Sequence, residues 1–364
     1  MRFNLPVAAA VCGIAYLGAA LVCIRRFGAE RRERAQRTPS VSILKPLRGV
    51  EEGLYENLCS FCEQDYPDFR VDFSVRDPGD PAVAIARRVV ERFPDRARLA
   101  AGGVPSSAAN PKISNLAQVA SRADGEIVVI ADADMRVGRD YLRAIVAPFE
   151  RAEVGLVTCL YRGVAAAGFA SALGAAFINE QFAPSVLVAG TLEPLRYGFG
   201  ATLAVRRRAL EEIGGIEALG AHIADDHRLG QLVSERGWQV VLSRYVVENL
   251  VAETSLTSLW SRELRWSRTI RSVRPWGHAF SFLTFGLPLA LGAAPFVRSA
   301  FARGSLIGSA LALRVAIHRA AARALGAPQS FALLIPVRDA LSVATWLAAF
   351  FDRSVSWRGE RLRL

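Results

Sequence analysis

Two carboxylates one residue apart, Asp132 and Asp134, follow an apolar run that ends at Ala131. In an extended chain alternate side chains point to the same side, so both carboxylates can reach one cation or its water shell. Their hard oxygen ligands suit magnesium or manganese, which can bridge a diphosphate and stabilise charge on a leaving group. The other interpretation is a solvated turn between a strand and a loop, because this short pattern is common. The pair therefore needs support from other motifs before it predicts a metal site.

A second acidic motif contains Asp77 and Asp80, at the end of an earlier apolar run. A carboxylate in this position can accept hydrogen bonds from a uracil or a ribose. Pro78 and Gly79 fit a plain turn equally well, with an aspartate capping the helix that follows. The motif predicts a nucleotide contact by Asp77 or by Asp80, and the sequence does not decide between them.

The third motif is the adjacent pair Asp225 and Asp226, at the start of a predicted helix. One interpretation is a helix cap, since carboxylates favour the positive end of the helix dipole. The other makes Asp226 a general base that takes a proton from an acceptor hydroxyl during an in-line displacement. Adjacent carboxylates repel each other, which can raise the pKa of one of them toward the range a base needs.

The fourth motif runs from Arg262 to Trp266 and includes Arg265. On a helix the two arginines share a face, so two guanidinium groups could bind a departing diphosphate. Trp266 could stack on an acceptor or pack the base of the site. The alternative is a basic amphipathic helix at the lipid headgroups, and both interpretations can hold together.

The pattern from residue 41 to about residue 245 predicts an α/β domain, whose strands and helices must position these motifs. Alternation of strands and helices predicts a mostly parallel sheet covered on both faces, with ligands at the carboxyl ends of its strands. No Gly-x-Gly-x-x-Gly follows the first strand, which disfavours a nucleotide-dependent dehydrogenase. The predicted strands are 41–47, 71–76, 126–131, 154–160, 201–205 and 238–242, and the predicted helices are 53–64, 81–93, 113–122, 139–149 and 225–236.

Apolar segments at both ends of the chain predict membrane helices. Residues 5–24 carry no charge and are long enough to cross the hydrocarbon core, and the arginines that follow place the next domain in the cytosol by the positive-inside rule. A signal peptide is the rival interpretation, but no clear cleavage site follows. Later apolar runs are 279–297, 305–317 and 331–351. The first and last can span, while the middle run is short and contains Arg314, which favours a re-entrant or interfacial helix. Arg338 and Asp339 in the last run should face protein or water rather than lipid.

The composition agrees with a membrane protein. Apolar residues make up 52% of the 364 residues and charged residues 22%, and the formal net charge is +11. This charge favours anionic partners, and without a recognisable nucleic-acid-binding module we expect a membrane surface and no nucleic acid. The five cysteines are too scattered for a disulfide framework, so we expect Cys59 and Cys62 to be packing residues in a reducing compartment.

Taken in order, the four motifs resemble those of inverting GT-A glycosyltransferases of the ceramide glucosyltransferase type. Two early acids, a third acidic base and a (Q/R)xxRW element are matched by Asp80, Asp132, Asp226 and residues 262–266. Residues 110–116 resemble the NPKxxNL segment of that family. A closer resemblance, through residues 155–163 and 264–275, is to the bacterial branch named hopanoid-biosynthesis-associated glycosyltransferase. Animal ceramide enzymes often carry only the first acid of the second motif, whereas this chain has both, so metal handling can differ.

The resemblance implies a GT-A domain with transmembrane helices at both ends of the chain. The expected organisation is an anchor and basic linker at 1–37, a cytosolic glycosyltransferase domain at 38–276 and a membrane-associated region at 277–364. It also implies roles for the motif residues: nucleotide binding by Asp77, Asp80, Lys112 and Asp132, metal binding by Asp132 and Asp134, proton abstraction by Asp226, and contact with the leaving group and acceptor by Arg262, Arg265 and Trp266.

The expected reaction transfers N-acetylglucosamine from its UDP-sugar to a hydroxyl of a hopanoid polyol, with inversion and with Mg or Mn. The expected location is the inner (cytoplasmic) membrane, crossed several times. Ceramide glucosylation is the runner-up. A processive polysaccharide synthase would share Asp226 and the Arg-Trp element but would carry more spanning helices. A non-enzymatic membrane scaffold is the remaining alternative.

Overall fold

The computed structural model describes residues 4–30, 35–102, 110–220, 222, 224–329, 331–351, 354–357 and 360–363. The chain forms two compact units, each assembled from segments that are distant in sequence. We call residues 31–161 and 194–250 the sheet unit, and residues 1–30, 162–193 and 251–364 the helical unit. Residues 162–193 and 251–276 pack in the helical unit, whereas the expected organisation grouped them with the sheet.

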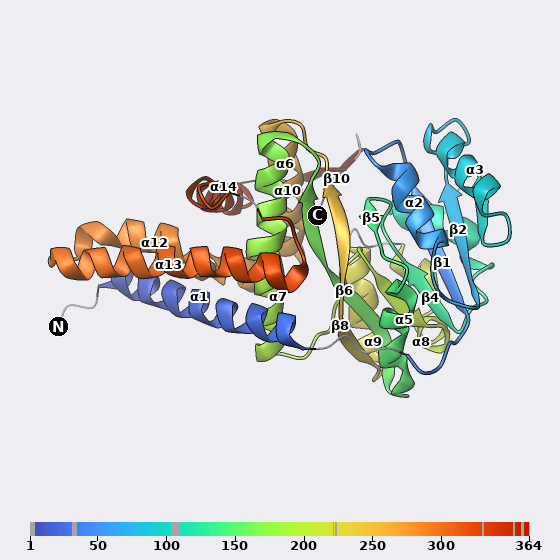
Figure 1. Cartoon of the computed structure of the whole chain (residues 1–364), viewed down its shortest axis with the longest axis horizontal. Coiled ribbons are helices and arrows are strands. Elements are labelled where there is room, and N and C mark those ends of the chain that lie inside the picture. Colours follow the sequence, from blue (N-terminus) through green and yellow to red (C-terminus); the bar gives the residue numbers. More distant parts are fainter. Residues whose placement is uncertain are drawn as a thin grey trace. The chain divides into compact units, whose positions relative to one another are not determined.

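The sheet unit contains an eight-stranded mixed sheet with the order β3-β2-β1-β4-β7-β6-β8-β5 (Figure 1). The first four strands are parallel, with Ile43 of β1 opposite Val71 of β2 and Val129 of β4. The strands are β1 (Val41–Leu47), β2 (Phe69–Val75), β3 (Ala97–Ala101), β4 (Ile127–Ile130), β5 (Met135–Arg136), β6 (Val154–Ala165), β7 (Leu203–Arg206) and β8 (Gln239–Val251).

The prediction of a mostly parallel sheet is wrong for the other half. β7 runs antiparallel to β4 and β6, and β5 runs antiparallel to β8. The chain leaves the sheet along β6, passes through residues 162–193 of the helical unit and returns along β7 in the opposite direction. All six predicted strands occur, while β3 and β5 were not predicted.

Apolar side chains of the sheet point alternately to two cores, so both faces are covered, as predicted. Ile43 packs with Phe61 and Tyr141 on one face, and its neighbour Leu44 packs with Ile113 on the other. All five predicted helices occur with shifted ends. The helices of this unit are α2 (Leu54–Cys62), α3 (Ala82–Arg92), α4 (Pro111–Ala120), α5 (Tyr141–Val146), α8 (Arg207–Glu212) and α9 (Asp225–Glu235), with 3-10 turns η1 (Ala147–Glu150) and η3 (Ile216–Leu219).

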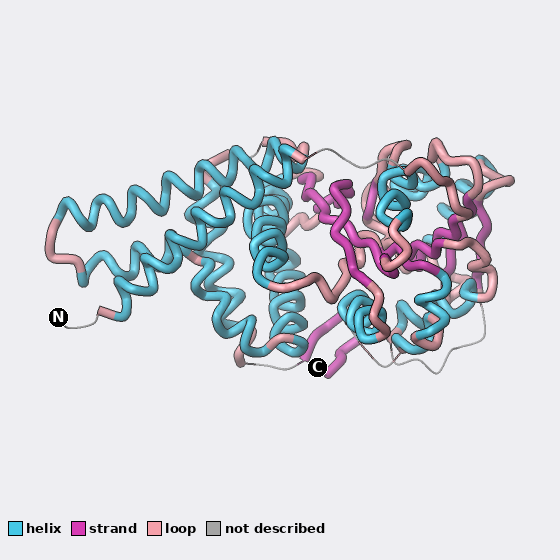
Figure 2. The backbone as a smooth tube through the Cα atoms, turned by 90° about the horizontal axis from the view of Figure 1, so that it is seen from below, coloured by secondary structure: helices cyan, strands magenta, loops and turns pink. Residues whose placement is uncertain are grey.

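The helical unit consists mainly of helices, which Figure 2 separates from the strands by colour. Its helices are α1 (Leu5–Ala29), α6 (Gly168–Phe177), the π-helical turn η2 (Ile178–Phe182), α7 (Ala183–Leu192), α10 (Leu256–Val273), α11 (Pro275–Phe280), α12 (Gly286–Ala293), α13 (Ala300–Leu325) and α14 (Leu334–Ala348). It also holds 3-10 turns η4 (Ser281–Thr284) and η5 (Ala294–Phe296), and strands β9 (Ser354–Trp357) and β10 (Glu360–Arg363) form an antiparallel pair.

Three helical stretches among the described residues are long and apolar enough to cross a membrane: α1, residues 168–192 and α13. A fourth is possible if the bent pair 275–284 and 286–296, which turns by 65°, counts as one span. The apolar run 279–297 therefore forms a bent pair of helices, which is a span only if the two are counted together, and α13 is a continuous helix of 26 residues rather than a short one. Arg314 of α13 is 3% exposed and is paired with acidic groups, so the charge does not interrupt the helix. The last predicted run, 331–351, forms α14, whose 15 residues are fewer than the predicted span needs, so that prediction is wrong.

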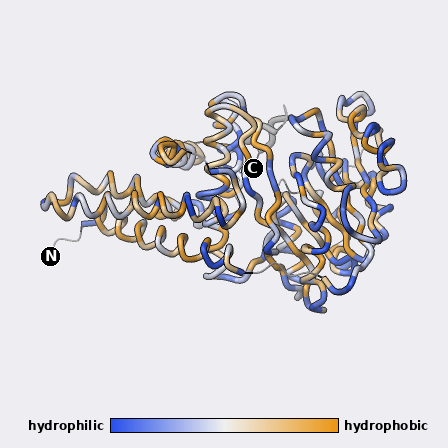
Figure 3. Tube along the Cα trace, viewed as in Figure 1, coloured by the Kyte–Doolittle hydropathy of each residue, from blue (hydrophilic) through white to orange (hydrophobic). Residues whose placement is uncertain are grey.

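Helices α1, α12 and α13 lie side by side and carry mostly apolar residues (Figure 3). Gly13 and Gly286 let α1 and α12 approach closely, because a Cβ on Gly13 would lie 2.9 Å from the Cα of Gly286. Small residues at such contacts are typical of membrane helix pairs. In α14, Arg338 and Asp339 are 0% and 3% exposed, which confirms that they face protein rather than lipid.

Candidate active site

Lys112 joins two of the acidic motifs at the edge of the sheet. It lies in the first turn of α4, which begins at Pro111 because the Asn110 side chain accepts a hydrogen bond from the Lys112 amide at 2.9 Å. The Lys112 Nζ lies 2.9 Å from an oxygen of Asp132 and 3.0 Å from an oxygen of Asp225. Burial alone lowers the pKa of Lys112, but these two carboxylates outweigh it and raise the pKa above its ordinary value. Lys112 is therefore a fixed positive charge.

Gly200, just before β7, forms a second link between the motifs. Its carbonyl accepts a hydrogen bond from the Asp132 amide at 3.1 Å, and its own amide donates to the carboxylate of Asp226 at 3.1 Å. A side chain at this position would collide with the carboxylate of Asp132. The second and third acidic motifs therefore lie together at one edge of the sheet, the second after β4 and the third at the start of α9.

Asp225 and Asp226 open helix α9 but have different surroundings. Asp225 is buried and receives hydrogen bonds or ion pairs from Asn110 and Lys112. Asp226 is half-buried, and its oxygens accept from the amides of Gly200 and His227. Burial and the adjacent Asp225 raise the pKa of Asp226 to about 6, although Lys112 opposes the shift. Asp226 is the member of the pair that can act as a base near neutral pH.

Asp134 and a buried lysine complete this edge. The Asp134 carboxylate accepts a hydrogen bond from Asn249 in β8 at 2.9 Å, and burial together with Asp132 raises its pKa. Lys45 in β1 is 0% exposed; its Nζ donates to the carbonyl of Asp132 at 2.8 Å and lies 3.5 Å from the centre of the Phe61 ring. Burial lowers the pKa of Lys45 to about 7, although Asp132 and Asp134 oppose the shift.

Asp132 and Asp134 carry the carboxylate oxygens that magnesium and manganese prefer as ligands. No group of three His, Cys, Asp or Glu side chains forms a metal cage within the part of the chain that the structure describes. A magnesium or manganese ion on a diphosphate needs only one or two protein carboxylates, because phosphate oxygens and water complete its shell. The Asp132 side chain is 37% exposed, so it keeps access to such a ligand.

Asp77 and Asp80 follow β2, two strands away from β4. Both oxygens of Asp80 accept from the Gly49 amide at 2.9 Å, and one accepts from Ala82 at 2.8 Å, so this carboxylate connects the loop after β1 to the start of α3. Asp77 is exposed and accepts from the Gly79 amide at 2.9 Å. Two strand spacings amount to roughly 10 Å, which is within the length of a nucleotide sugar.

The predicted residues Arg262, Arg265 and Trp266 lie on α10 in the helical unit. Arg262 pairs with Glu253 at 2.8 Å, and its guanidinium lies 4.9 Å from the centre of the Trp266 ring. Trp266 stacks on Phe177 of α6 with ring centres 6.1 Å apart. The structure therefore brings Arg262 and Trp266 together, while their role toward Asp226 stays a prediction.

Lys45 and Gly200 were not predicted as site residues from the sequence. A signal existed for Lys45, because it is the one charged residue in the apolar run 41–47. Gly200 gave a weaker signal, since glycines before a strand are common and its two partners are far away in the sequence.

The mixed sheet and its flanking helices define the class of protein: this is the GT-A fold of glycosyltransferases. The fold matches that of the mannosyltransferase PcManGT from Pyrobaculum calidifontis, which was solved in complex with GDP-Man and Mn2+. The TM-score is 0.60 at 20% sequence identity, and the match covers 95% of this chain and 99% of that chain.

The chain belongs to glycosyl transferase family 21, whose profile matches residues 5–364. It is 26% identical to ceramide glucosyltransferase 1 of Caenorhabditis elegans over 65% of this chain and 51% of that protein. It is 25% identical to beta-monoglucosyldiacylglycerol synthase of Trichormus variabilis over 71% of this chain and 54% of that protein. The chain thus spans about half the length of these curated relatives.

Proposed function

We propose that the protein transfers a sugar from a UDP-sugar to a hydroxyl of a membrane lipid, with inversion at the sugar carbon. The observation that carries this proposal is the convergence of Asp132, Asp225 and Asp226 around Lys112 and Gly200. A glycosyltransferase needs a base for the acceptor and charged groups for a diphosphate in one place, and this edge of the sheet offers both.

In the proposed reaction Asp226 takes the proton of the acceptor hydroxyl. The acceptor oxygen then bonds to the anomeric carbon as the bond from that carbon to the diphosphate oxygen breaks, so UDP leaves without a covalent intermediate. Asp225 is occupied by Lys112, which leaves Asp226 as the base. Its raised pKa keeps it basic enough for this task while it remains ionised at neutral pH.

The other predicted residues act on the donor in this proposal. Asp132 and Asp134 would hold a magnesium or manganese ion, which supplies positive charge to the departing diphosphate when bound. Asp77 or Asp80 would contact the nucleoside, and Lys112 would keep Asp132 oriented. Arg262, Arg265 and Trp266 would contact the leaving group and the acceptor.

The acceptor is proposed to be a lipid because apolar helices that could span a membrane flank the sheet in sequence, and because named relatives glycosylate ceramide or diacylglycerol. The arginine-rich segment after α1 supports a sheet unit on the cytosolic side of the inner membrane.

We propose UDP-N-acetylglucosamine as the donor and a hopanoid polyol as the acceptor, because residues 155–163 and 264–275 resemble the hopanoid-associated branch. Ceramide is the second acceptor candidate, supported by the ceramide relatives. Three or four candidate spans among the described residues favour either lipid over a processive polysaccharide synthase, which needs more helices for a channel.

A donor and acceptor screen tests the proposal. The full chain in lipid nanodiscs is incubated with UDP-N-acetylglucosamine or UDP-glucose, with Mg or Mn, and with a hopanoid polyol, ceramide or diacylglycerol. Products are identified by mass spectrometry. The expected result is one glycolipid carrying a single sugar together with an equal amount of UDP. Long polymer would favour the synthase, and no UDP release with any lipid would contradict the proposal.

A further inference from the structure

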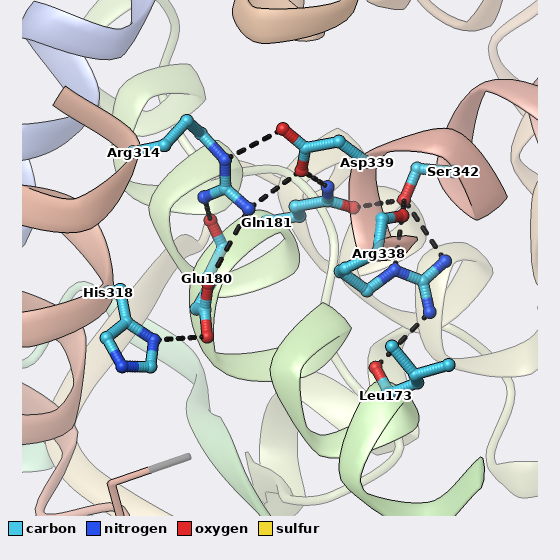
Figure 4. Close-up of polar contacts among 8 residues, drawn as sticks. All are labelled: Leu173, Glu180, Gln181, Arg314, His318, Arg338, Asp339 and Ser342. Atoms are coloured by element: carbon cyan, nitrogen blue, oxygen red, sulfur yellow. Dashed lines mark hydrogen bonds and ion pairs between the residues drawn. The ribbon is translucent and has the colours of Figure 1, made fainter. Parts of the chain in front are cut away.

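A sealed network of charged side chains lies inside the helical unit (Figure 4). Two neighbours in α14, Arg338 and Asp339, point to different partners. Asp339 accepts from Arg314 of α13, with nitrogen to oxygen distances of 2.8 Å and 3.1 Å, and from Gln181 of η2 at 2.9 Å. Glu180 extends this side of the network, because it lies 3.5 Å from Arg314 and is also paired with a histidine of α13.

Arg338 instead binds α10. Its Nη1 and Nη2 each lie 2.7 Å from one carboxylate oxygen of Glu263, and both side chains are buried. The same guanidinium also donates to the Leu173 carbonyl at 3.2 Å and to the Ser342 hydroxyl at 3.1 Å. Two parallel hydrogen bonds allow the guanidinium and the carboxylate only one relative orientation. This contact therefore fixes the position of the helical turn of α10 that contains Glu263.

Glu263 occupies the position directly after Arg262 and two before Arg265. Consecutive residues of an α-helix point in directions about 100° apart. Holding Glu263 toward α14 therefore sets the rotation of α10 about its own axis. That rotation decides where Arg262 and Arg265 point.

A second contact leads from Arg338 to the same group. Its guanidinium lies 5.3 Å from the centre of the Phe177 ring, and Trp266 stacks on Phe177 with ring centres 6.1 Å apart. Arg262 lies in turn over Trp266. Arg338 thus touches both Glu263, beside Arg262 in the helix, and Phe177, beneath Trp266.

We propose that Arg338 is a positioning residue for sugar transfer, holding Arg262 and Trp266 in their working orientation through Glu263 and Phe177. This rests on the proposed function, which assigns Arg262 and Trp266 to the leaving group and acceptor. Stability alone does not explain the pair, because well-packed apolar residues often serve equally well in place of a buried ion pair. The two parallel bonds give α10 a directional contact that apolar residues in their place would not supply.

The chain offers a matched control. A double variant, Glu263→Gln with Arg338→Gln, removes one buried positive and one buried negative charge from the pair that holds α10. Arg314→Gln with Asp339→Asn removes the same charges from a pair that lies on α13 and α14. We expect the first variant to lower kcat at least about tenfold, since a small misplacement of catalytic groups has large effects. The control should keep kcat within about twofold of wild type, with a comparable loss of thermal stability.

Both variants are assayed in nanodiscs with the donor and lipid that give the most transfer, and kcat and KM are measured for each substrate. Arg338→Lys keeps the positive charge but cannot form two parallel bonds to Glu263. Compared with the Glu263/Arg338 double variant, it should restore thermal stability more than kcat. Should the first variant not fold, Phe177→Leu leaves both ion pairs intact and should still lower kcat about threefold by loosening Trp266. Wild-type kcat in folded Glu263/Arg338 and Phe177 variants, or an equal loss in the control, would overturn the inference.

Arg262→Ala separates this inference from the proposed function. If Arg262→Ala leaves transfer unchanged, the role proposed for Arg262 fails and Arg338 has nothing to position. If Arg262→Ala abolishes transfer while the Glu263/Arg338 variant works normally, the positioning role of Arg338 fails alone.

Discussion

In each unit a positively charged side chain lies between two carboxylates, and the carboxylates of the two units differ in their exposure to solvent. Lys112 links Asp132 and Asp225 at 2.9 Å and 3.0 Å, and Arg314 links Asp339 and Glu180 at 2.8 Å and 3.5 Å. The Asp132 side chain is 37% exposed, whereas those of Asp339 and Glu180 are 4% and 5% exposed. An accessible carboxylate can exchange a protein partner for a ligand, while a sealed one cannot do so without opening the fold. Access, rather than ion pairing itself, distinguishes a candidate active site from a structural contact.

The largest expected effect is that of Asp226→Asn in the accessible region. The amide keeps the shape of the side chain and an oxygen for the Gly200 amide, but it cannot take a proton, so transfer should fall about 10³-fold. The measurement is glycolipid formed per folded molecule, with UDP binding as the check on the site. Asp339→Asn is the sealed counterpart and should lower the melting temperature while transfer per folded molecule stays near wild type. Reversed behaviour of the two variants would contradict the distinction between the accessible and the buried carboxylates.

Asp132→Ala should have the next largest effect. It removes a proposed metal ligand and one of the two carboxylate partners of Lys112, and we expect about a hundredfold loss of kcat/KM for the donor. Chelation of divalent metal should abolish transfer by the wild type, and added Mn or Mg should restore it. Full activity in excess chelator would contradict a metal held by Asp132 and Asp134.

Gly200→Ala tests whether donor binding depends on the position of the Asp132 carboxylate. The new methyl group would meet the Asp132 carboxylate, which must then move away from Lys112. We expect about a tenfold rise in the donor KM with a nearly unchanged melting temperature. A Cβ added at Gly292 of α12 would meet no atom within 4 Å, so Gly292→Ala is the control and should leave the donor KM unchanged.

The pH profile gives the smallest effect. Asp226 acts as a base only when ionised, and burial beside Asp225 raises its pKa to about 6. Because the folded pKa is raised, the ionised fraction is lost as the pH falls through about 6, and kcat/KM should drop about fourfold between pH 7 and pH 5.5. An activity that stays constant down to pH 5 would exclude a base with this pKa.

Much of the sheet unit could be predicted because local patterns decide it. Strand β1 has the bounds expected from its apolar run, and α9 begins at the predicted Asp225. The short β5, with two residues, carries no periodicity to detect. The antiparallel half of the sheet depends on where the chain goes between β6 and β7, and no local pattern records that path.

The candidate active site likewise contains some residues that local sequence patterns predict and others that they do not. The acidic pair after an apolar run and the acidic pair at a predicted helix start were both visible in the sequence, and the structure brings Asp132 and Asp226 close together through Gly200. Lys45 and Gly200 act through partners that are 87 and 26 residues away, so their contacts emerge only in the folded chain. For the same reason α13 was predicted too short: the partner that neutralises Arg314 is Asp339 in a later helix.

The proposed reaction is a direct displacement at the sugar carbon with Asp226 as the base. The most direct measurement is the anomeric configuration of the glycolipid made from a UDP-α-sugar, read by proton NMR of the purified product. A β-linked product is the predicted result. An α-linked product would require a different mechanism and would contradict the account.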